Sequence, residues 1–452
     1  MKMERPESGF YRSRVRRLED RVRLNAAPEA VVSDLPDDQF INEDFQFSVT
    51  FDNVADVNDA DPNDIGYGPF VDVTVGPGVA VNNVSYLGVS TQAQEVGAWD
   101  GSQWVDASGD PVTEHPLDQA GGLLEIPDGV ALGLDENASW LNVLAPFGSY
   151  TPDHPEIELV FSATMTESPD TMTPSGAVPG DDILITAQGD FQFGGDPLDN
   201  PSTDPPIQQG AAQSDSVTPI IMRLVKAVQL PEAEKAQGPN FDFTYTITVE
   251  IADSVTATDL NIRDLLPDNL FFLNADAPGA DTIDAPGAGE SQGVPGVGTV
   301  TEATFTYDMV TGTTAGNDIV ITLTAYAPEF AADGTDLDAM DEDSPAAYVV
   351  ATNNAEVVSA DYMAPDGTIV PVGGTNSGQL QDSIDITIRP YTVLKAVVVE
   401  GGGDAKPGKY LEFNVDLGEE GFRRWDGPCA GVAGRNERPD LFLPVQHDGW
   451  RE

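Results

Sequence analysis

The sequence predicts an all-β chain in which antiparallel sandwiches follow one another after a short basic N-terminal helix. Many segments alternate apolar and polar residues with the period of two that half-buried strands show. Strands do not alternate with long helical patterns, which argues against a parallel α/β sheet. Turn residues are plentiful, with 44 Gly and 35 Pro in 452 residues. Several short strands joined by tight turns are therefore expected.

The chain is strongly acidic. It carries 76 Asp and Glu against 21 Lys and Arg, a formal net charge of −55. This charge repels phosphate backbones and anionic lipid headgroups, so nucleic-acid binding is not expected. No apolar run reaches the ~18–20 residues that a membrane-spanning helix needs, so no transmembrane segment is predicted. The single cysteine, Cys429, excludes an intramolecular disulfide.

Residues 1–35 are predicted to form a basic amphipathic leader. Eight of the 21 positive charges lie in the first 23 residues. Tyr11, Val15, Leu18 and Val22 recur at helical spacing and would share one face of a short helix. The segment lacks the apolar core of a Sec signal peptide, so export without an evident Sec signal is expected.

The stretch RRLEDRVRLNAAP, Arg16 to Pro28, resembles the LEPR-XLL motif at the start of very large bacterial surface proteins. Leu18, Glu19 and Arg21 match the motif, whereas Asp20 stands where its proline would be. The resemblance implies a surface or extracellular protein. The alternative is a basic helix that merely precedes the first domain.

The alternating segments predict strands along most of the chain. The clearest candidates are FQFSVTF (Phe45 to Phe51), FVDVTV (Phe70 to Val75), IELVFSA (Ile157 to Ala163), DILIT (Asp182 to Thr186), FDFTYTITV (Phe241 to Val249), DIVITLTAYA (Asp318 to Ala327) and IDITI (Ile384 to Ile388). Each is rich in β-branched or aromatic residues and is bounded by turn formers.

An internal repeat divides the chain. LVKAVQL at Leu224 is echoed by VLKAVVV at Val393, and the strand at Phe241 by YLEFNVDL at Tyr410, both 169 residues further on. We therefore predict a divergent acidic unit at 36–219, a complete unit at 220–390 and the start of a third at 391–421. Residues 422–452 have a foreign composition, which predicts an aberrant tail from a shifted frame or a truncation near Gly421; the alternative is a genuine terminal extension.

The complete unit resembles the conserved repeat of prokaryotic surface proteins called domain of unknown function eleven. The resemblance lies in the strand with Lys226, in Asp264 before Leu266-Pro267, and in the late strand with Asn353 and Ala355. It implies an immunoglobulin-like sandwich that serves as a spacer or adhesive module. The stretch from residue 274 to 300 is expected to be an inserted loop.

The same resemblance suggests an isopeptide bond between Lys226 and Asn353, formed beside Asp264. Burial would favour a neutral, nucleophilic amine and a protonated carboxyl group that polarises the amide. The alternative is that Lys226 points outward as a surface charge and that Asn353 or Asn354 belongs to a turn.

Two acid-rich loops are candidate calcium sites, because calcium takes 6–8 oxygen ligands. Neither loop has the Gly and Glu positions of an EF-hand, and either could equally be a hydrated loop. The candidate ligands are Asp59, Asp61, Asn63 and Asp64 in the first loop, and Asp336, Asp338, Asp341 and Asp343 in the second.

No catalytic constellation is found in the sequence. His115, His154 and His447 are too scattered for a zinc site and are expected in surface loops. The favoured function is a non-catalytic structural or adhesive stalk of a large secreted or surface-attached bacterial protein, with an unknown adhesion target or matrix component as partner. The alternatives are accessory repeats of a secreted hydrolase whose catalytic domain lies elsewhere, or a calcium buffer.

Overall fold

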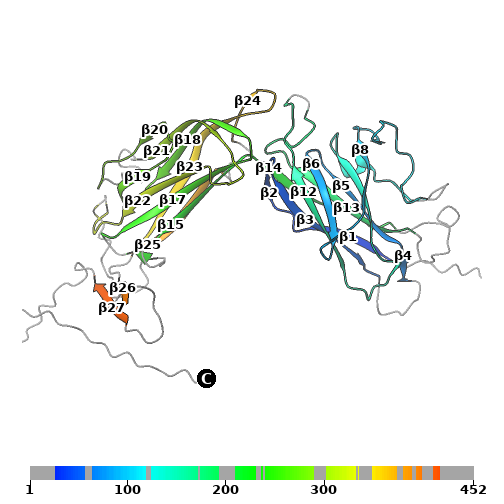
Figure 1. Ribbon diagram of the computed structural model, residues 1–452, viewed down its shortest axis with the longest axis horizontal. Helices are drawn as coiled ribbons and strands as arrows, with labels where there is room; N and C mark the ends of the chain where they lie inside the picture. Colours follow the sequence, from blue (N-terminus) through cyan, green and yellow to red (C-terminus); the bar gives the residue numbers. More distant parts are fainter. Residues whose placement is uncertain are drawn as a thin grey trace, which may run out of the picture.

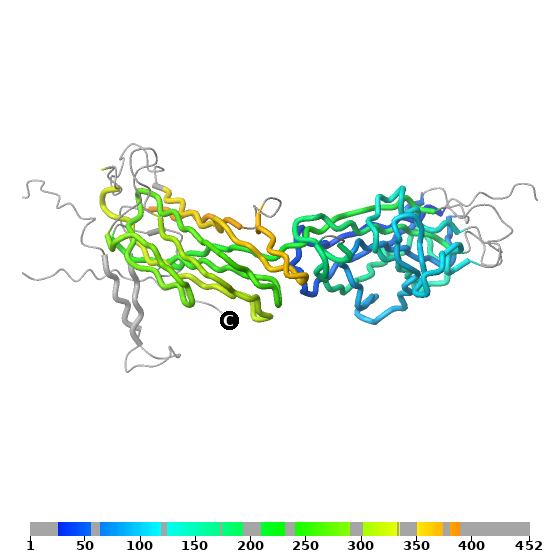
Figure 2. Tube along the Cα trace, turned by 90° about the horizontal axis from the view of Figure 1, so that it is seen from above, coloured from blue at the N-terminus to red at the C-terminus, as the bar shows by residue number. Residues whose placement is uncertain are grey.

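The computed structural model describes residues 26–55, 64–118, 124–171, 174–192, 209–230, 236–237, 240–289, 302–331, 334, 349–373, 380–388, 393–399 and 411–417. These residues form two β-sandwiches placed end to end (Figures 1 and 2), followed by a separate hairpin (Figure 1). The all-β fold class is confirmed. The predicted leader helix and its LEPR-XLL-like motif lie outside the described residues, except for the last residues of the motif.

The first sandwich consists of two main sheets. One sheet has the order β1 (Pro28–Ser33), β3 (Asp44–Asn53), β12 (Ile157–Met165), β6 (Val79–Tyr86) and β7 (Val89–Ser90). The other has the order β2 (Asp38–Phe40), β14 (Gln213–Ile220), β13 (Ile183–Phe191), β5 (Pro69–Val75), β10 (Ser139–Leu144), β8 (Ala93–Trp99) and β9 (Trp104–Val105). β4 (Gly66–Tyr67) pairs with β11 (Ser149–Tyr150), and α1 (Gly129–Leu132) is a single helical turn.

The second sandwich follows the same plan with fewer strands. Its smaller sheet has the order β15 (Met222–Gln229), β17 (Asp242–Ile251), β22 (Ile319–Tyr326) and β19 (Phe271–Asp276). The larger has the order β16 (Ala236–Gln237), β25 (Gln381–Ile388), β23 (Val349–Met363), β18 (Thr256–Leu265), β21 (Ala303–Thr311) and β20 (Thr282–Asp284), with β24 (Ile369–Pro371) paired to β23.

The predicted strands are all present. β26 (Val393–Val399) and β27 (Leu411–Leu417) pair antiparallel, as the corresponding strands β15 and β17 do in the complete unit. Most pairings are antiparallel, as expected. Two short pairs at sheet edges are parallel instead, β2 with β14 and β16 with β25.

Two sequence-based boundaries need correction. The first sandwich begins before residue 36, because β1 pairs with β3 and buries Ala30 and Val32 in the core. The stretch from residue 274 is not simply an inserted loop, because β19 continues to Asp276 and β20 pairs with β21. The Gly and Asp residues of this stretch favour turns, and they hid the end of β19 and the short strand β20 in the sequence.

The link between the sandwiches is one residue long. β14 ends at Ile220 and β15 begins at Met222, and all three residues from Ile220 to Met222 are buried. The backbone of the link is also hydrogen-bonded to both sandwiches. The N–H of Ile41 in the first donates to Ile220 O, and the N–H of Ala252 in the second donates to Ile221 O. The apolar core therefore continues from one sandwich into the other. No helix in the described part of the chain is long and apolar enough to cross a membrane.

Candidate cross-linking site

Three strands bring the predicted isopeptide residues together inside the second sandwich. Lys226 lies on β15, Asp264 near the end of β18, and Asn353 on β23. β18 and β23 are neighbours, with Asp264 opposite Ala355, whereas β15 belongs to the facing sheet. The alternation of each strand turns all three side chains inward. Lys226 is 5% exposed, and Asp264 and Asn353 are fully buried.

Lys226 and Asp264 form a direct pair in this dry interior. The Lys226 Nζ donates to Asp264 Oδ2. Burial lowers the pKa of Lys226, and the neighbouring Asp264 offsets only part of that effect. Burial likewise raises the pKa of Asp264. Both shifts disfavour the charged forms, so the pair moves towards a neutral amine beside a protonated carboxyl group.

Asn353 is the third residue of the group, but its side-chain amide has no hydrogen-bond partner there. Its amide lies close enough to Asp264 to lower the pKa of that carboxyl group in part. Among the described residues, however, neither its Oδ1 nor its Nδ2 has a hydrogen-bond partner, and Asp264 Oδ1 has none either. A buried side-chain amide without partners is costly and calls for a chemical explanation.

An aromatic ring borders the amine of Lys226, and a backbone hydrogen bond holds its strand in place. The ring of Tyr245, a buried residue of β17, lies 4.9 Å from Lys226 Nζ, measured to the ring centroid. The backbone N–H of Lys226 donates to Asp382 Oδ2 on β25 at 2.7 Å. This bond ties the edge strand β15 to the facing sheet. The expected alternative, an outward-pointing Lys226 with Asn353 in a turn, does not describe the structure.

The predicted calcium loops are almost wholly outside the described residues. Of the eight candidate ligands only Asp64 is described, and it is buried, with its backbone O accepting from Asn53 Nδ2 at 2.7 Å. Asp59, Asp61, Asn63, Asp336, Asp338, Asp341 and Asp343 lie outside the described ranges, so both sites stay predictions. Within the described ranges, no group of three or more His, Cys, Asp or Glu side chains could hold a metal ion.

The structure corrects the expectation that His115 lies on the surface. It is 2% exposed, and its Nε2 contacts Asp72 Oδ2 at 3.0 Å. Its Nδ1 accepts from the N–H of Leu117, so Nε2 carries the proton and donates to Asp72. Trp140 and Asn142 also donate to Asp72. With both ring nitrogens engaged, His115 fixes the covering segment, here residues 106–118 and 124–128, to Asp72 on β5.

Asp190 is a second buried carboxyl group on the same face. It is fully buried on β13, and neither of its oxygens has a hydrogen-bond partner within the described part of the chain. Burial and the nearby Asp72 raise its pKa to about 9, although Gln209 and the backbone of Gly210 act in the opposite direction. No sequence pattern distinguishes Asp190, because the segment that covers it comes from elsewhere in the chain.

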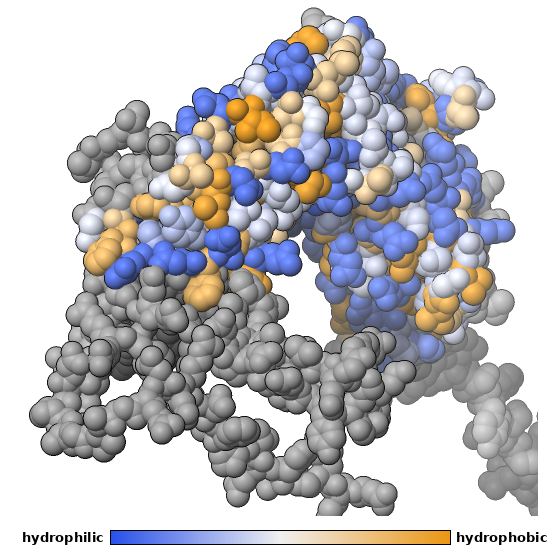
Figure 3. All heavy atoms as spheres, turned by 60° about the vertical axis from the view of Figure 1, so that its left-hand side comes forward, coloured by the Kyte–Doolittle hydropathy of each residue, from blue (hydrophilic) through white to orange (hydrophobic). Residues whose placement is uncertain are grey.

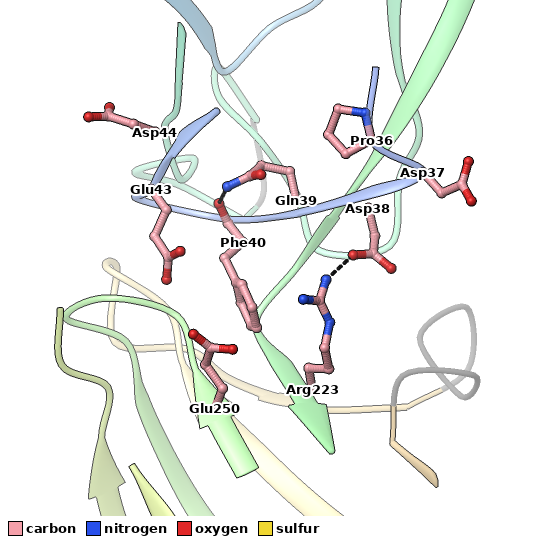
Figure 4. A pocket seen from close by; sticks show the side chains of 9 residues that line it. All are labelled: Pro36, Asp37, Asp38, Gln39, Phe40, Glu43, Asp44, Arg223 and Glu250. Carbon is pink, nitrogen blue, oxygen red and sulfur yellow. Dashed lines mark hydrogen bonds and ion pairs between the residues drawn. The ribbon is translucent and has the colours of Figure 1, made fainter. Parts of the chain in front are cut away.

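The junction between the sandwiches contains an acidic groove of ≈ 540 Å³ (Figure 4). Arg223 reaches across it, pairs with Asp38 and lies over the Phe40 ring, 4.9 Å from its centroid. The carboxylates of Glu43 and Glu250 face each other in the close view. Burial, followed by the charges of Asp253 and Glu250, raises the pKa of Glu43.

The visible outer surface shows no large apolar patch. In the space-filling view, hydrophobic side chains are scattered among hydrophilic ones (Figure 3). Exposed apolar residues of the second sandwich, such as Met309, Val350 and Ile283, lie on different strands. Single exposed apolar residues are normal and indicate no binding site.

No protein-family model matches the chain, and no curated protein matches it. Among solved structures, it is similar to the major pilin subunit BcpA of Bacillus cereus, with 11% identity over 80% of this chain and 66% of that chain and a TM-score of 0.20. It is also similar to the T6 backbone pilin of serotype M6 Streptococcus pyogenes, with 10% identity over 83% of this chain and 54% of that chain and a TM-score of 0.21. A cohesin module from a Clostridium perfringens family 33 glycoside hydrolase is similar over 37% of this chain and 97% of that chain, with 6% identity and a TM-score of 0.23. The function proposed below rests on the residues of this chain.

Proposed function

We propose that this chain is a structural stalk segment of a secreted or surface-attached bacterial protein, in which the second sandwich is locked by an isopeptide bond between Lys226 and Asn353. The observation that carries the proposal is the unpartnered amide of Asn353, buried beside the Lys226–Asp264 pair. The stiff, one-residue link between the sandwiches and the high acidic charge support an extended, extracellular role.

The condensation needs no outside reactant. The neutral Nζ of Lys226 attacks the side-chain carbonyl carbon of Asn353 while the protonated Asp264 polarises that carbonyl. A bond forms between Nζ and this carbon, and the bond from the carbon to Nδ2 breaks. Asp264 passes a proton from Nζ to the departing nitrogen, which leaves as ammonia. The buried NH₂ group that had no partner is thereby removed.

The bond would join the strand that enters the second sandwich to a strand near its exit. Lys226 lies five residues after Ile221, and Asn353 lies 35 residues before the end of β25 at Ile388. Under tension, the chain between Lys226 and Asn353 would therefore be shielded from stretching. Such a module suits a spacer that holds another part of the protein away from its attachment point.

Intact-mass analysis of the full chain tests the proposal. We expect a mass lower than the sequence mass by one ammonia, and a branched Lys226–Asn353 peptide after digestion. The variants Lys226→Arg and Asn353→Ala should have their full sequence masses, whereas Asn354→Ala, at the exposed neighbouring position, should keep the deficit. A wild-type chain with its plain sequence mass would rule the cross-link out.

A further inference from the structure

We infer that Tyr245 is a positioning residue for the condensation of Lys226 with Asn353; this inference rests on the function proposed above. Its role is to cover the Lys226 amine with an aromatic face that admits no water. Tyr245 takes part in no proton transfer and in no covalent step.

Register and burial place the ring over the amine. Tyr245 and Lys226 lie on the adjacent strands β17 and β15, where Lys226 pairs with Ile247 and Tyr245 with Val228. Both side chains point inward, and Tyr245 is fully buried. The Nζ atom lies 4.9 Å from the ring centroid, while Asp264 Oδ2 contacts the same Nζ. Ring and carboxyl group thus both lie next to the nucleophile.

Asp264 also lies close enough to Tyr245 to affect the pKa of its hydroxyl. Burial raises the pKa of the Tyr245 hydroxyl, and Asp264 would raise it further whenever that carboxyl group is ionised. This shift is consistent with a phenol that lies within the same dry pocket as the reacting groups. It also means that the hydroxyl stays protonated and does not supply a base.

Dryness controls the population of neutral amine. A lysine in water keeps a pKa near 10.4, so little of it is nucleophilic at neutral pH. Burial lowers the pKa of Lys226. If the ring were removed, water could enter and hydrate the ammonium, and the pKa would return towards its ordinary value. The reaction would then slow at neutral pH and accelerate as the pH rises.

A purely structural Tyr245 would behave differently. Its loss would lower the stability of the sandwich, but in those molecules that fold the condensation would keep the pH dependence of the wild type. The shape of the pH profile therefore separates positioning from packing.

The experiment follows ammonia loss by intact mass in freshly synthesised full chain at pH 6 to 10. For wild type and Tyr245→Phe, which keeps the ring, we expect similar rates with little pH dependence. For Tyr245→Leu and for Tyr245→Met, whose flexible side chain fills the space without a ring, we expect at least about a tenfold slower reaction at pH 7 that accelerates with pH. Circular dichroism and the unfolding midpoint check that each variant is folded.

Tyr307 supplies the matched control. It is a second buried tyrosine of the same sandwich, but it lies on β21 opposite Leu260, four residues along β18 from Asp264. Tyr307→Leu should react like the wild type. A folded Tyr245→Leu or Tyr245→Met chain with the wild-type rate and profile would overturn the inference. A wild-type chain that never loses ammonia would instead overturn the proposed function.

Discussion

Among the described residues, the cores of both sandwiches contain aromatic rings, but only the core of the second also buries a lysine. In the first, Phe47 stacks on Phe161 with ring centroids 4.8 Å apart, and Phe51 contacts Tyr150 and Phe191 edge to face. The chain contains no Lys or Arg from residue 24 to residue 222, and the same stretch contains 34 Asp and Glu residues. The first sandwich therefore cannot form the lysine-based bond proposed for the second.

Two buried carboxyl groups, one in each sandwich, also differ in their hydrogen-bond partners. Asp72 in the first is surrounded by donors from His115, Trp140 and Asn142, which serve to hold a covering segment. Asp264 in the second faces an amine and an unpartnered amide. A buried carboxylate whose hydrogen bonds are all made, such as Asp72, is typical of a structural role. A buried group in which polar atoms lack hydrogen-bond partners, such as Lys226, Asp264 and Asn353, is a candidate reactive site.

The largest expected effect is the loss of the covalent link. Asn353→Ala should destabilise the second sandwich by ~5 kcal/mol, because an unlinked unfolded chain gains the entropy of a loop of over a hundred residues. Calorimetry should show the transition of the second sandwich at a lower temperature and that of the first unchanged. Asn354→Ala is the control, and an equal shift in both variants would contradict the link.

A core truncation in the first sandwich should come next. Trp104 is 1% exposed, and its Nε1 donates to Pro127 O at 2.7 Å beneath the covering segment. Trp104→Ala should cost about 3–5 kcal/mol through lost burial and a cavity. Only the transition of the first sandwich should move in calorimetry, with the exposed Val130→Ala as control. A shift of the second transition by the same amount would show that the two sandwiches unfold as one unit.

Asp190→Asn should change how the stability of the first sandwich depends on pH. The folded pKa of Asp190 is raised to about 9, so between about pH 4 and 9 the native state holds a proton that the unfolded state has released. Its contribution to stability therefore falls as pH rises through this window. Urea midpoints from pH 5 to 9 should fall less steeply in the variant. The exposed Asp153→Asn should keep the wild-type slope; a variant slope equal to wild type would exclude the effect.

The smallest effect is expected at the junction. Arg223→Ala removes the pair with Asp38 and the contact with the Phe40 ring, and should cost roughly 0.5–1 kcal/mol, since the arginine is partly exposed. Small-angle scattering should nevertheless show the same end-to-end arrangement, because the buried link at Ile221 persists. A bent or broadened distribution would mean that Arg223, not the link, fixes the junction.

Alternation was a good guide where one face of a strand meets solvent. β17 alternates throughout, and its inward residues were predictable from FDFTYTITV. β5 is buried on both faces because the covering segment lies over it, so Asp72 is buried although it occupies a polar position of FVDVTV. β10 lacks alternation for the same reason. Long-range covering segments are invisible to a local pattern.

The candidate site was predictable only in part. Lys226, Asp264 and Asn353 stand out in the sequence through the repeat and its resemblance, and the structure places them in one core. Tyr245 occupies an ordinary inward position of an alternating strand, and nothing in the sequence relates it to a lysine 19 residues earlier. Its contact with Nζ depends on the register between β15 and β17, which single-sequence reasoning does not provide.

The buried link at Ile221 also bears on degradation. Proteases cleave segments that can be drawn out into an extended conformation, and such segments are exposed and weakly bonded. Between β14 and β15 the chain offers a single residue, 2% exposed, flanked by backbone hydrogen bonds to both sandwiches. Separation of the two sandwiches by cleavage at this point would first require local unfolding, so the junction should be long-lived in a protease-rich environment.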